Sequence, residues 1–152
     1  MIYVHYGHNK YDEDQFVPIQ NFIKWVKPNG GLWASPVESP HGWKNWNETS
    51  NYMQCDEKNS FKFKLKADTK VLVLDSLESL QRLVPDGKSS INGYVEGITE
   101  DTKQYYLNFE VLARRYDAIL YEVSKCHELY WVLYGGDCDS LLVLIKDKIE
   151  VL

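Results

Sequence analysis

With 152 residues, of which 44% are hydrophobic, 26% charged and 14% aromatic, the chain has the size and composition of one folded domain and not of a disordered segment. The formal net charge of −5 and the scatter of lysines among acidic residues exclude the basic footprint with which proteins grip nucleic acid. No stretch is apolar for long enough to span a membrane, and the first residues lack a leader pattern. We therefore expect a single domain over residues 1–152, with neither nucleic acid nor a membrane as partner.

Two strands and two helices are predicted in the first third of the chain. Residues 2–6 are β-branched and aromatic and indicate a strand, whereas apolar residues at helical spacing predict a helix over 16–26. A proline and two glycines in 27–31 indicate a turn that leads into a second strand at 32–35. The polar, aromatic-bearing stretch 42–52 favours a short helix.

Strands dominate the predicted remainder. Residues 61–66 alternate apolar side chains with lysine, as a half-buried strand does, and 71–74 are continuously apolar, as in a covered strand. Asp75, Ser76 and Glu78 then supply N-cap chemistry for a helix through Val84. A surface connection over 85–102, a helix over 100–115 and strands at 116–123, 130–134 and 141–145 follow. Strands grouped at both ends, with helices inserted between them, predict an α+β fold.

The cysteines predict free thiols. Cys55, Cys126 and Cys138 are odd in number and lack the close Cys or His spacing of a disulfide framework or a structural zinc site. Free thiols persist in a reducing compartment, so the sequence predicts a cytoplasmic protein without a bound metal.

Familiar hydrolase and nucleotide motifs are missing from the sequence. No serine elbow or cysteine-protease signature surrounds Ser35, Ser39 or Cys55, although His41 is near in sequence. Neither a P-loop nor a GxGxxG after a strand is present. These absences argue against a hydrolase triad, ATP hydrolysis and Rossmann-type dinucleotide binding.

Candidate binding residues lie early in the chain. The two ring nitrogens of His5 can orient a ribose hydroxyl or a backbone group, although a lone strand histidine is more often structural. Gly30 and Gly31 form a turn that would also let a flat ligand approach the backbone beside the Trp33 ring. Three aromatic residues after this strand could equally be core or line a cleft: Trp43, Trp46 and Tyr52.

Candidate acids lie late in the chain. Glu122 is the carboxylate within the otherwise apolar strand 118–123, so it faces either solvent or a cleft. Asp137 and Asp139 flank Cys138 at the start of the last predicted strand and provide a second carboxylate candidate, although turn aspartates usually cap backbone groups.

Taken in chain order, His5, the Gly-Leu-Trp-Ala-Ser stretch 31–35, the aromatic helix and Glu122 resemble the ADP-ribosyltransferase family. The likeness is to the branch with a histidine, aromatic and glutamate triad, which includes diphtheria-type toxins and poly-ADP-ribose polymerases. The chain is also similar in size and layout to small phage-encoded ADP-ribosyltransferases that disable bacterial defence. This resemblance implies a compact split β-sheet core of ADP-ribosyltransferase type with short helices inserted, and NAD as the substrate.

The resemblance also implies roles for individual residues. His5 would bind the adenosine-side ribose, although Tyr6 separates it from the glycine that usually follows in the family, which leaves His8 as the alternative imidazole. The nicotinamide ring would lie among residues of the second strand and the following helix: Gly31, Leu32, Trp33, Ser35 and one of Trp43, Trp46 or Tyr52. Glu122, or in its place Asp139, would stabilise the oxocarbenium-like centre that forms when the glycosidic bond breaks.

These implications predict an NAD-dependent mono-ADP-ribosyltransferase that modifies a host protein, as a phage-encoded inhibitor of host defence would. Two other interpretations remain open. One is a degenerate protein of the same fold that binds NAD or a related nucleotide without chemistry, or that sequesters a signalling nucleotide. The other is an acidic interaction protein whose tryptophans and tyrosines anchor a partner.

Overall fold

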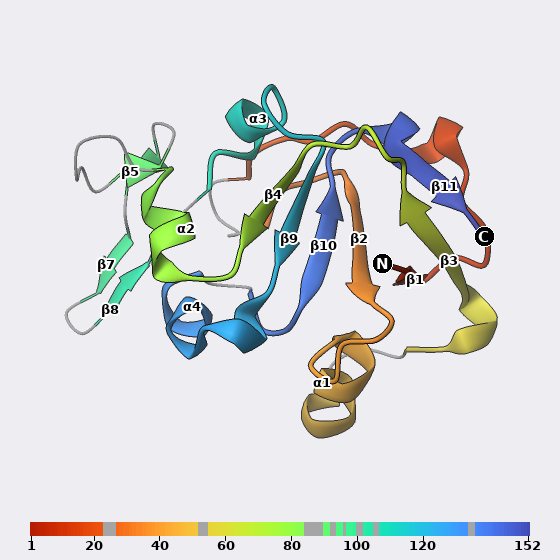
Figure 1. Cartoon of the computed structure of the whole chain (residues 1–152), viewed down its shortest axis with the longest axis horizontal. Helices are drawn as coiled ribbons and strands as arrows, with labels where there is room; N and C mark the ends of the chain where they lie inside the picture. Colours follow the sequence, from red (N-terminus) through yellow and green to blue (C-terminus); the bar gives the residue numbers. More distant parts are fainter. Residues whose placement is uncertain are drawn as a thin grey trace.

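The computed structural model describes residues 1–22, 27–51, 55–83, 90–91, 94–95, 97–99, 102–104, 107–133 and 136–152. Its centre is a seven-stranded sheet with the strand order β11-β3-β1-β2-β10-β9-β4 (Figure 1). Neighbouring strands run antiparallel, apart from β4 and β9, which are parallel. The strands are Tyr3–Tyr6 (β1), Leu32–Pro36 (β2), Ser60–Leu65 (β3), Val71–Leu74 (β4), Ala118–Tyr121 (β9), Ser140–Val143 (β10) and Ile149–Val151 (β11).

Short helices and two small hairpins complete the described part of the chain. The α-helices are Trp43–Ser50 (α1), Leu77–Gln81 (α2), Phe109–Leu112 (α3) and His127–Val132 (α4). Short 3-10 helices span Glu13–Gln15, Glu57–Asn59, Val123–Lys125 and Lys146–Lys148. The hairpins pair Ser90–Ile91 (β5) with Tyr94–Val95 (β6), and Gly97–Thr99 (β7) with Thr102–Gln104 (β8). The predicted α+β class is confirmed. Among the described residues, no helix has the length and apolar character needed to cross a bilayer.

Side-chain alternation explains how the sheet is buried. In β3, Phe61 and Phe63 are 7% and 0% exposed, whereas Lys62 and Lys64 face solvent, as the sequence pattern predicts. Every residue of β9 and β10 is buried, which matches their continuous apolar sequences. β9 and β10 therefore form the middle of the core.

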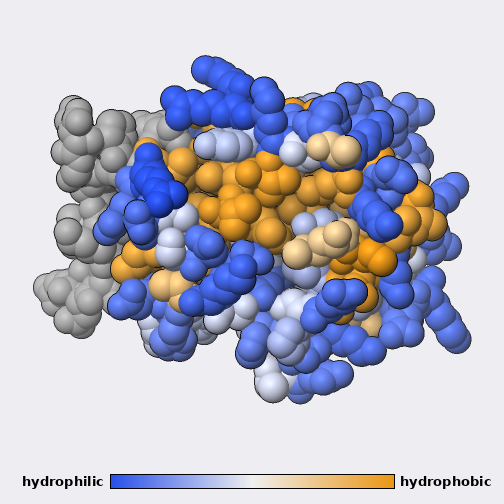
Figure 2. Space-filling model, viewed as in Figure 1, coloured by the Kyte–Doolittle hydropathy of each residue, from blue (hydrophilic) through white to orange (hydrophobic). Residues whose placement is uncertain are grey.

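Two hydrophobic clusters lie on opposite faces of the sheet. Ile119 and Leu142 belong to the first cluster, which also contains the buried leucines of the helices: Leu80, Leu112 and Leu129. Their strand neighbours Leu120 and Leu141 belong to the second cluster, together with Tyr3, Phe61 and Phe63. Apolar side chains also reach the surface, as a band across the middle of the face seen in Figure 2.

β2 joins the two halves of the sheet. Its beginning pairs with β10, with Trp33 opposite Leu142, whereas its end pairs with β1, with Tyr3 opposite Pro36 and Val4 opposite Ser35. The β1–β2 ladder stops there. Residues 5–6 of β1 and 32–33 of β2 therefore lie beyond the last paired residues of the two strands, and we call this unpaired region the seam.

The helix predicted over 16–26 does not form across the described residues 16–22. Gln20 and Asn29 form an isolated antiparallel bridge instead, and the Gly31 amide donates to the Val17 carbonyl at 2.8 Å. Pro18 explains the error, because it lacks an N–H and disfavours helical backbone at the residue before it. Residues 23–26 lie outside the described residues.

Two further predictions in the second half of the chain are wrong. Residues 130–133 are not a strand: 127–132 form α4, because Leu129 and Leu133, four residues apart, are both buried in the first cluster. The helix predicted over 100–115 is reduced to α3, and Thr102–Gln104 forms a strand. The described parts of the predicted surface connection form hairpins, and β11 was not predicted at all.

The start of α2 has the predicted N-cap at Ser76, but Ser79 and not Glu78 is its partner in the capping box. The Ser76 hydroxyl accepts from the Ser79 amide at 3.1 Å, and the Ser79 hydroxyl closes the capping box in place of Glu78. The helix ends at Gln81, and Val84 lies outside the described residues.

Candidate functional site

A cavity of about 580 Å³ opens at the seam. Its size lies within the usual range for small-molecule sites, about 300–1,000 Å³. One wall comes from β1 and the segment after it, and the other from the loop that leads into β2. The lining residues are His5, His8, Lys10, Tyr11, Asp12, Gln15, Phe16, Val17, Gln20, Asn29, Gly30, Gly31, Leu32, Trp33 and Phe61. We call this the seam cavity; it contains four of the predicted binding residues, His5, Gly31, Leu32 and Trp33.

His5 bridges the seam with its side chain. Its Nδ1 lies 2.7 Å from the carbonyl oxygen of Trp33, where a backbone ladder would otherwise continue. Because a carbonyl can only accept, Nδ1 carries the proton and Nε2 presents a lone pair. Burial lowers the pKa of His5, an effect that the bond to Trp33 opposes and the neighbouring His8 reinforces. The ring is thus held neutral and in one orientation.

His8 lies over His5, so the two alternative imidazoles are neighbours. Gly7 adopts φ +117°, and the turn that it allows stacks the two rings with their centroids 5.4 Å apart. The His8 Nδ1 is 3.1 Å from the His5 Nε2. Since the His5 Nε2 presents a lone pair, the His8 Nδ1–H is the donor. The Nε2 of His8 is directed away from His5. The structure therefore forms a chain of hydrogen bonds from His8 through His5 to the backbone.

The glycine pair is required by the fold of the turn itself. Gly30 and Gly31 have φ values of +76° and +70°, which side chains other than glycine rarely adopt. A Cβ on Gly31 would lie 2.8 Å from Leu142 Cδ1 and 2.9 Å from the Val143 carbonyl oxygen, and one on Gly30 would overlap the Pro18 carbonyl. The close approach that these glycines permit is thus to protein atoms, at the edge of the cavity.

The Trp33 indole already makes two contacts through its ring. Its ring stacks on Tyr121 with centroids 5.6 Å apart, and the Lys27 ammonium lies 5.4 Å from the ring centroid. Alternation along β2 sends Leu32 to the second cluster and Trp33 to the first. A ligand could stack on Trp33 only if the exposed Lys27 side chain moved away.

Ser35 and Trp43 lie at the opposite end of β2 from the seam. The Ser35 hydroxyl accepts from the Trp43 amide at 2.9 Å, and the Trp43 indole N–H donates to the Ser140 hydroxyl at 2.8 Å. These bonds fasten the first turn of α1 to β2 and β10. Trp46 is half-buried on α1 and lines neither this end nor the seam cavity, and Tyr52 lies outside the described residues.

Asp139 is the centre of the hydrogen bonds at that end. It is 6% exposed, and its carboxylate accepts from the Ser39 hydroxyl at 2.7 Å and from the Ser124 amide and hydroxyl at 2.9 and 2.6 Å. Three donors from two segments, the loop that contains Ser39 and the short 3-10 helix that contains Ser124, converge on this one side chain. We call the group Ser35, Ser39, Trp43, Ser124, Asp139 and Ser140 the strand-end cluster.

Glu122 follows β9 and does not lie within it, because the strand ends at Tyr121. Its carboxylate pairs with the Lys125 ammonium at 2.7 Å, and the Glu122 side chain is 17% exposed. The pKa of Tyr3 is raised, mainly by burial and then by the charge of Glu122, so the carboxylate is close enough to act on that phenol.

The two acids are separated from the seam cavity along the strands. Trp33 lies opposite Leu142, which lies opposite Ile119. Asp139 and Glu122 are each three residues from that line, toward the Pro36 end of β2. At roughly 3.3 Å per residue this offset is about 10 Å. Neither acid lines the seam cavity.

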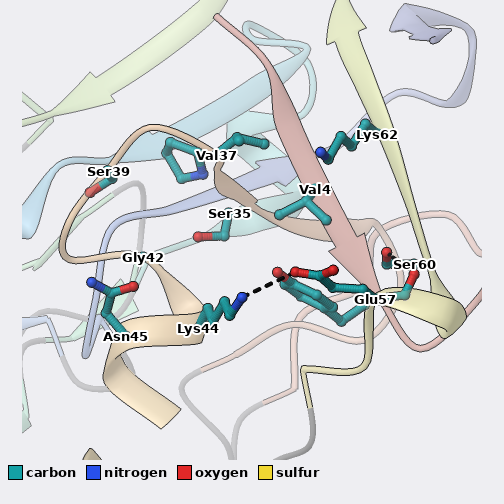
Figure 3. Close-up of a pocket in the computed structure, with 12 residues that line it drawn as sticks. Val4, Ser35, Val37, Ser39, Gly42, Lys44, Asn45, Glu57, Ser60 and Lys62 are labelled. Carbon is teal, nitrogen blue, oxygen red and sulfur yellow. Dashed lines mark hydrogen bonds and ion pairs between the residues drawn. The ribbon is translucent and has the colours of Figure 1, made fainter. Parts of the chain in front are cut away.

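A second cavity, of about 370 Å³, lies between α1, β1 and β3 (Figure 3). Ser35 is on its wall, and the Lys44 ammonium and Glu57 carboxylate form an ion pair of 3.0 Å beside it. The sequence patterns did not predict this cavity, because Lys44, Glu57 and Lys62 come from segments that only the fold brings together. Its charged groups are largely paired with one another.

Among the described residues, no three His, Cys, Asp or Glu side chains are grouped to hold a metal ion, and the three cysteines are free thiols. Comparison of the chain with protein-family models, curated proteins and solved structures gave no match.

Proposed function

We propose that the chain binds NAD in the seam cavity, as a protein of ADP-ribosyltransferase type. The observation that carries this proposal is the His5 side chain, held in one tautomer by the Trp33 carbonyl at the wall of a nucleotide-sized cavity. Because its Nε2 already accepts from His8, His5 acts on a ligand through His8, the alternative imidazole of the resemblance. The Nε2 of His8 is directed away from His5 and can bond to a ribose hydroxyl or a neighbouring phosphate.

The other walls of the seam cavity also suit a nucleotide. Phe16 and Tyr11 provide aromatic surface, and the amides of Gln20 and Asn29 can bond to a base or a ribose. The Tyr11 hydroxyl donates to the Lys146 carbonyl at 2.7 Å, and its pKa is raised to about 12, first by burial, so it remains a neutral phenol. Sites of this kind combine apolar walls with a few placed polar groups.

ADP-ribosyl transfer to a protein target is the activity that we propose for the bound NAD. Loss of nicotinamide leaves a positive ribosyl centre, which needs a carboxylate close by. We assign this role to Glu122, because the three donors on Asp139 already occupy its oxygens, whereas among the described residues the Glu122 carboxylate is held by the exposed Lys125 alone. Binding rests directly on the seam geometry; transfer also requires the ligand to extend toward the far end of β2.

Calorimetric titration of NAD into the purified chain tests the binding proposal. We expect saturable binding that His5→Ala weakens by at least about tenfold, since the variant loses the ring that holds His8 in place at the cavity wall. His41→Ala is the matched control, because His41 is exposed and lines neither cavity. Equal loss in both variants, or no binding by the wild type, would overturn the proposal.

Transfer is tested by incubating the chain with labelled NAD and a host lysate. A labelled protein band that disappears in Glu122→Gln and persists in Asp137→Asn supports transfer with Glu122 as the acid. NAD binding without any band would leave a nucleotide-binding protein without chemistry. Absence of both would favour the acidic interaction protein.

A further inference from the structure

The two histidines and Lys10 form a small group at one wall of the seam cavity. His8 is exposed, its Nδ1–H donates to His5, and the other side of its ring is not used in any bond among the described residues. Lys10 is exposed and makes no ion pair with a described residue. Both side chains line the cavity that His5 orients.

The cavity lining has no net charge until one of the two histidines, His5 or His8, takes up a proton. The charged or titratable residues of the lining are His5, His8, Lys10, Tyr11 and Asp12, all from β1 and the segment that follows it. Lys10 and Asp12 cancel, and the Asp12 carboxylate is turned toward the Asp14 amide, which it caps at 3.0 Å. The lining residues of the opposite wall, between Gln15 and Trp33, are uncharged, and β3 contributes Phe61. The Lys27 ammonium lies near this wall, over the Trp33 ring, but does not line the cavity.

A proton taken up by the pair belongs on His8. His5 already donates from Nδ1 to a carbonyl and is partly buried, so a second proton on it would face the His8 ring. On the exposed His8 the proton can sit on Nε2 while Nδ1–H keeps its bond to His5, which a charged donor strengthens. The lining then has a net charge of about +1, against −5 for the whole chain.

Resting on the proposed NAD site, we propose that protonated His8 and Lys10 hold the phosphate groups of the ligand, so that the seam cavity selects nucleotides with a diphosphate and binds them more tightly as the pH falls. Imidazolium and ammonium groups donate charge-assisted hydrogen bonds to phosphate oxygens, and a fixed anion in turn stabilises the proton on the ring. Uptake of one proton with each ligand gives a limiting change in affinity of about tenfold per pH unit.

The test is titration of the full chain with ADP-ribose at about pH 6 and about pH 8, on either side of neutrality. Adenosine, which lacks phosphate, is the matched ligand. We expect ADP-ribose to bind at least about tenfold more tightly at the lower pH, and adenosine to bind weakly at both. In His8→Asn the pH dependence disappears, and in Lys10→Gln the affinity falls by a similar factor at both pH values.

His41→Asn, which alters an exposed histidine outside the cavity, retains the wild-type dependence. ADP-ribose binding that is equally tight at both pH values, or a dependence that survives in His8→Asn, overturns this assignment while leaving the NAD site intact. The same dependence for adenosine overturns the role in phosphate binding. If neither NAD nor ADP-ribose binds at either pH, the proposed function fails together with this inference.

Discussion

The seam cavity and the strand-end cluster lie at opposite ends of β2, and they differ in how fully their polar groups are hydrogen-bonded within the protein. At the strand end, Asp139 receives three hydrogen bonds, and each serine around it has a partner within the cluster. At the seam, His5 has one bond to the backbone and one to His8, and beyond that pair the cavity remains open.

This difference separates residues that build the fold from residues that can meet a ligand. Buried polar groups that satisfy one another stabilise a structure, and a ligand could bind them only by breaking existing bonds. Groups that line a cavity with unused hydrogen-bonding capacity lose nothing of that kind. Most of the binding residues implied by the family resemblance therefore fall into two sets. His5 and residues 31–33 line the seam cavity, whereas Ser35 and Trp43 are hydrogen-bonded within the strand-end cluster.

The largest expected effect is from Asp139→Ala, which leaves the hydroxyls of Ser39 and Ser124 and the Ser124 amide without an acceptor. We expect a loss of about 3 kcal/mol in the free energy of unfolding, measured by urea titration. Asp137→Ala, two residues away and half-exposed, is the control. A change of under about 0.5 kcal/mol for Asp139→Ala would contradict the structural role of the cluster.

Gly31→Ala tests the turn that forms one edge of the seam cavity. The positive φ and the contacts of the added Cβ with Leu142 and Val143 should lower the free energy of unfolding by about 2 kcal/mol. Gly97→Ala changes a glycine in the separate β7–β8 hairpin and serves for comparison. Equal stability of Gly31→Ala and wild type would show that the turn can relax without cost.

Removal of the Glu122 carboxylate should have a much smaller effect on stability than removal of Asp139. Glu122→Gln breaks an ion pair with the largely exposed Lys125, and such pairs contribute under about 1 kcal/mol. The same urea titration measures this change. A loss as large as that of Asp139→Ala would mean that Glu122 belongs to the structural set.

The smallest expected effect is on the free energy of unfolding at acidic pH. Because burial lowers the pKa of His5 in the folded state, the unfolded chain binds this proton first, and the contribution of His5 to stability is lost as the pH falls below the ordinary value of 6.5. His5→Asn should therefore show a flatter decline in the free energy of unfolding between neutral pH and about pH 5. A steeper decline in the variant would contradict the sign.

Local sequence patterns predicted most of the sheet. Alternation in β3, the apolar runs of β4, β9 and β10 and the punctuation around β2 are short-range signals, and each corresponds to a strand. The errors arise where the same residue types suit two structures. Tyr130, Trp131 and Val132 favour a strand by type, but the i, i+4 leucines of α4 pack on the core and decide for a helix.

The site could be predicted only in part, because its geometry depends on strand pairing. His5 and Trp33 are 28 residues apart, and their contact follows from the β1–β2 register, which no local pattern specifies. The partners of the Asp139 carboxylate, Ser39 and Ser124, come from two distant segments in the same way, so the sequence could not distinguish a structural acid from a catalytic one. A glycine between two histidines was the available signal for the His5–His8 pair.

The central claim is that a nucleotide binds at the seam and not at the strand-end cluster. An amide-resonance NMR titration of the chain with NAD tests it most directly. The account predicts the largest shifts at His5, His8, Gly31 and Leu32, with little change at Ser124 and Ser140. Shifts concentrated at Ser124, Asp139 and Ser140, or none at saturating NAD, would contradict it.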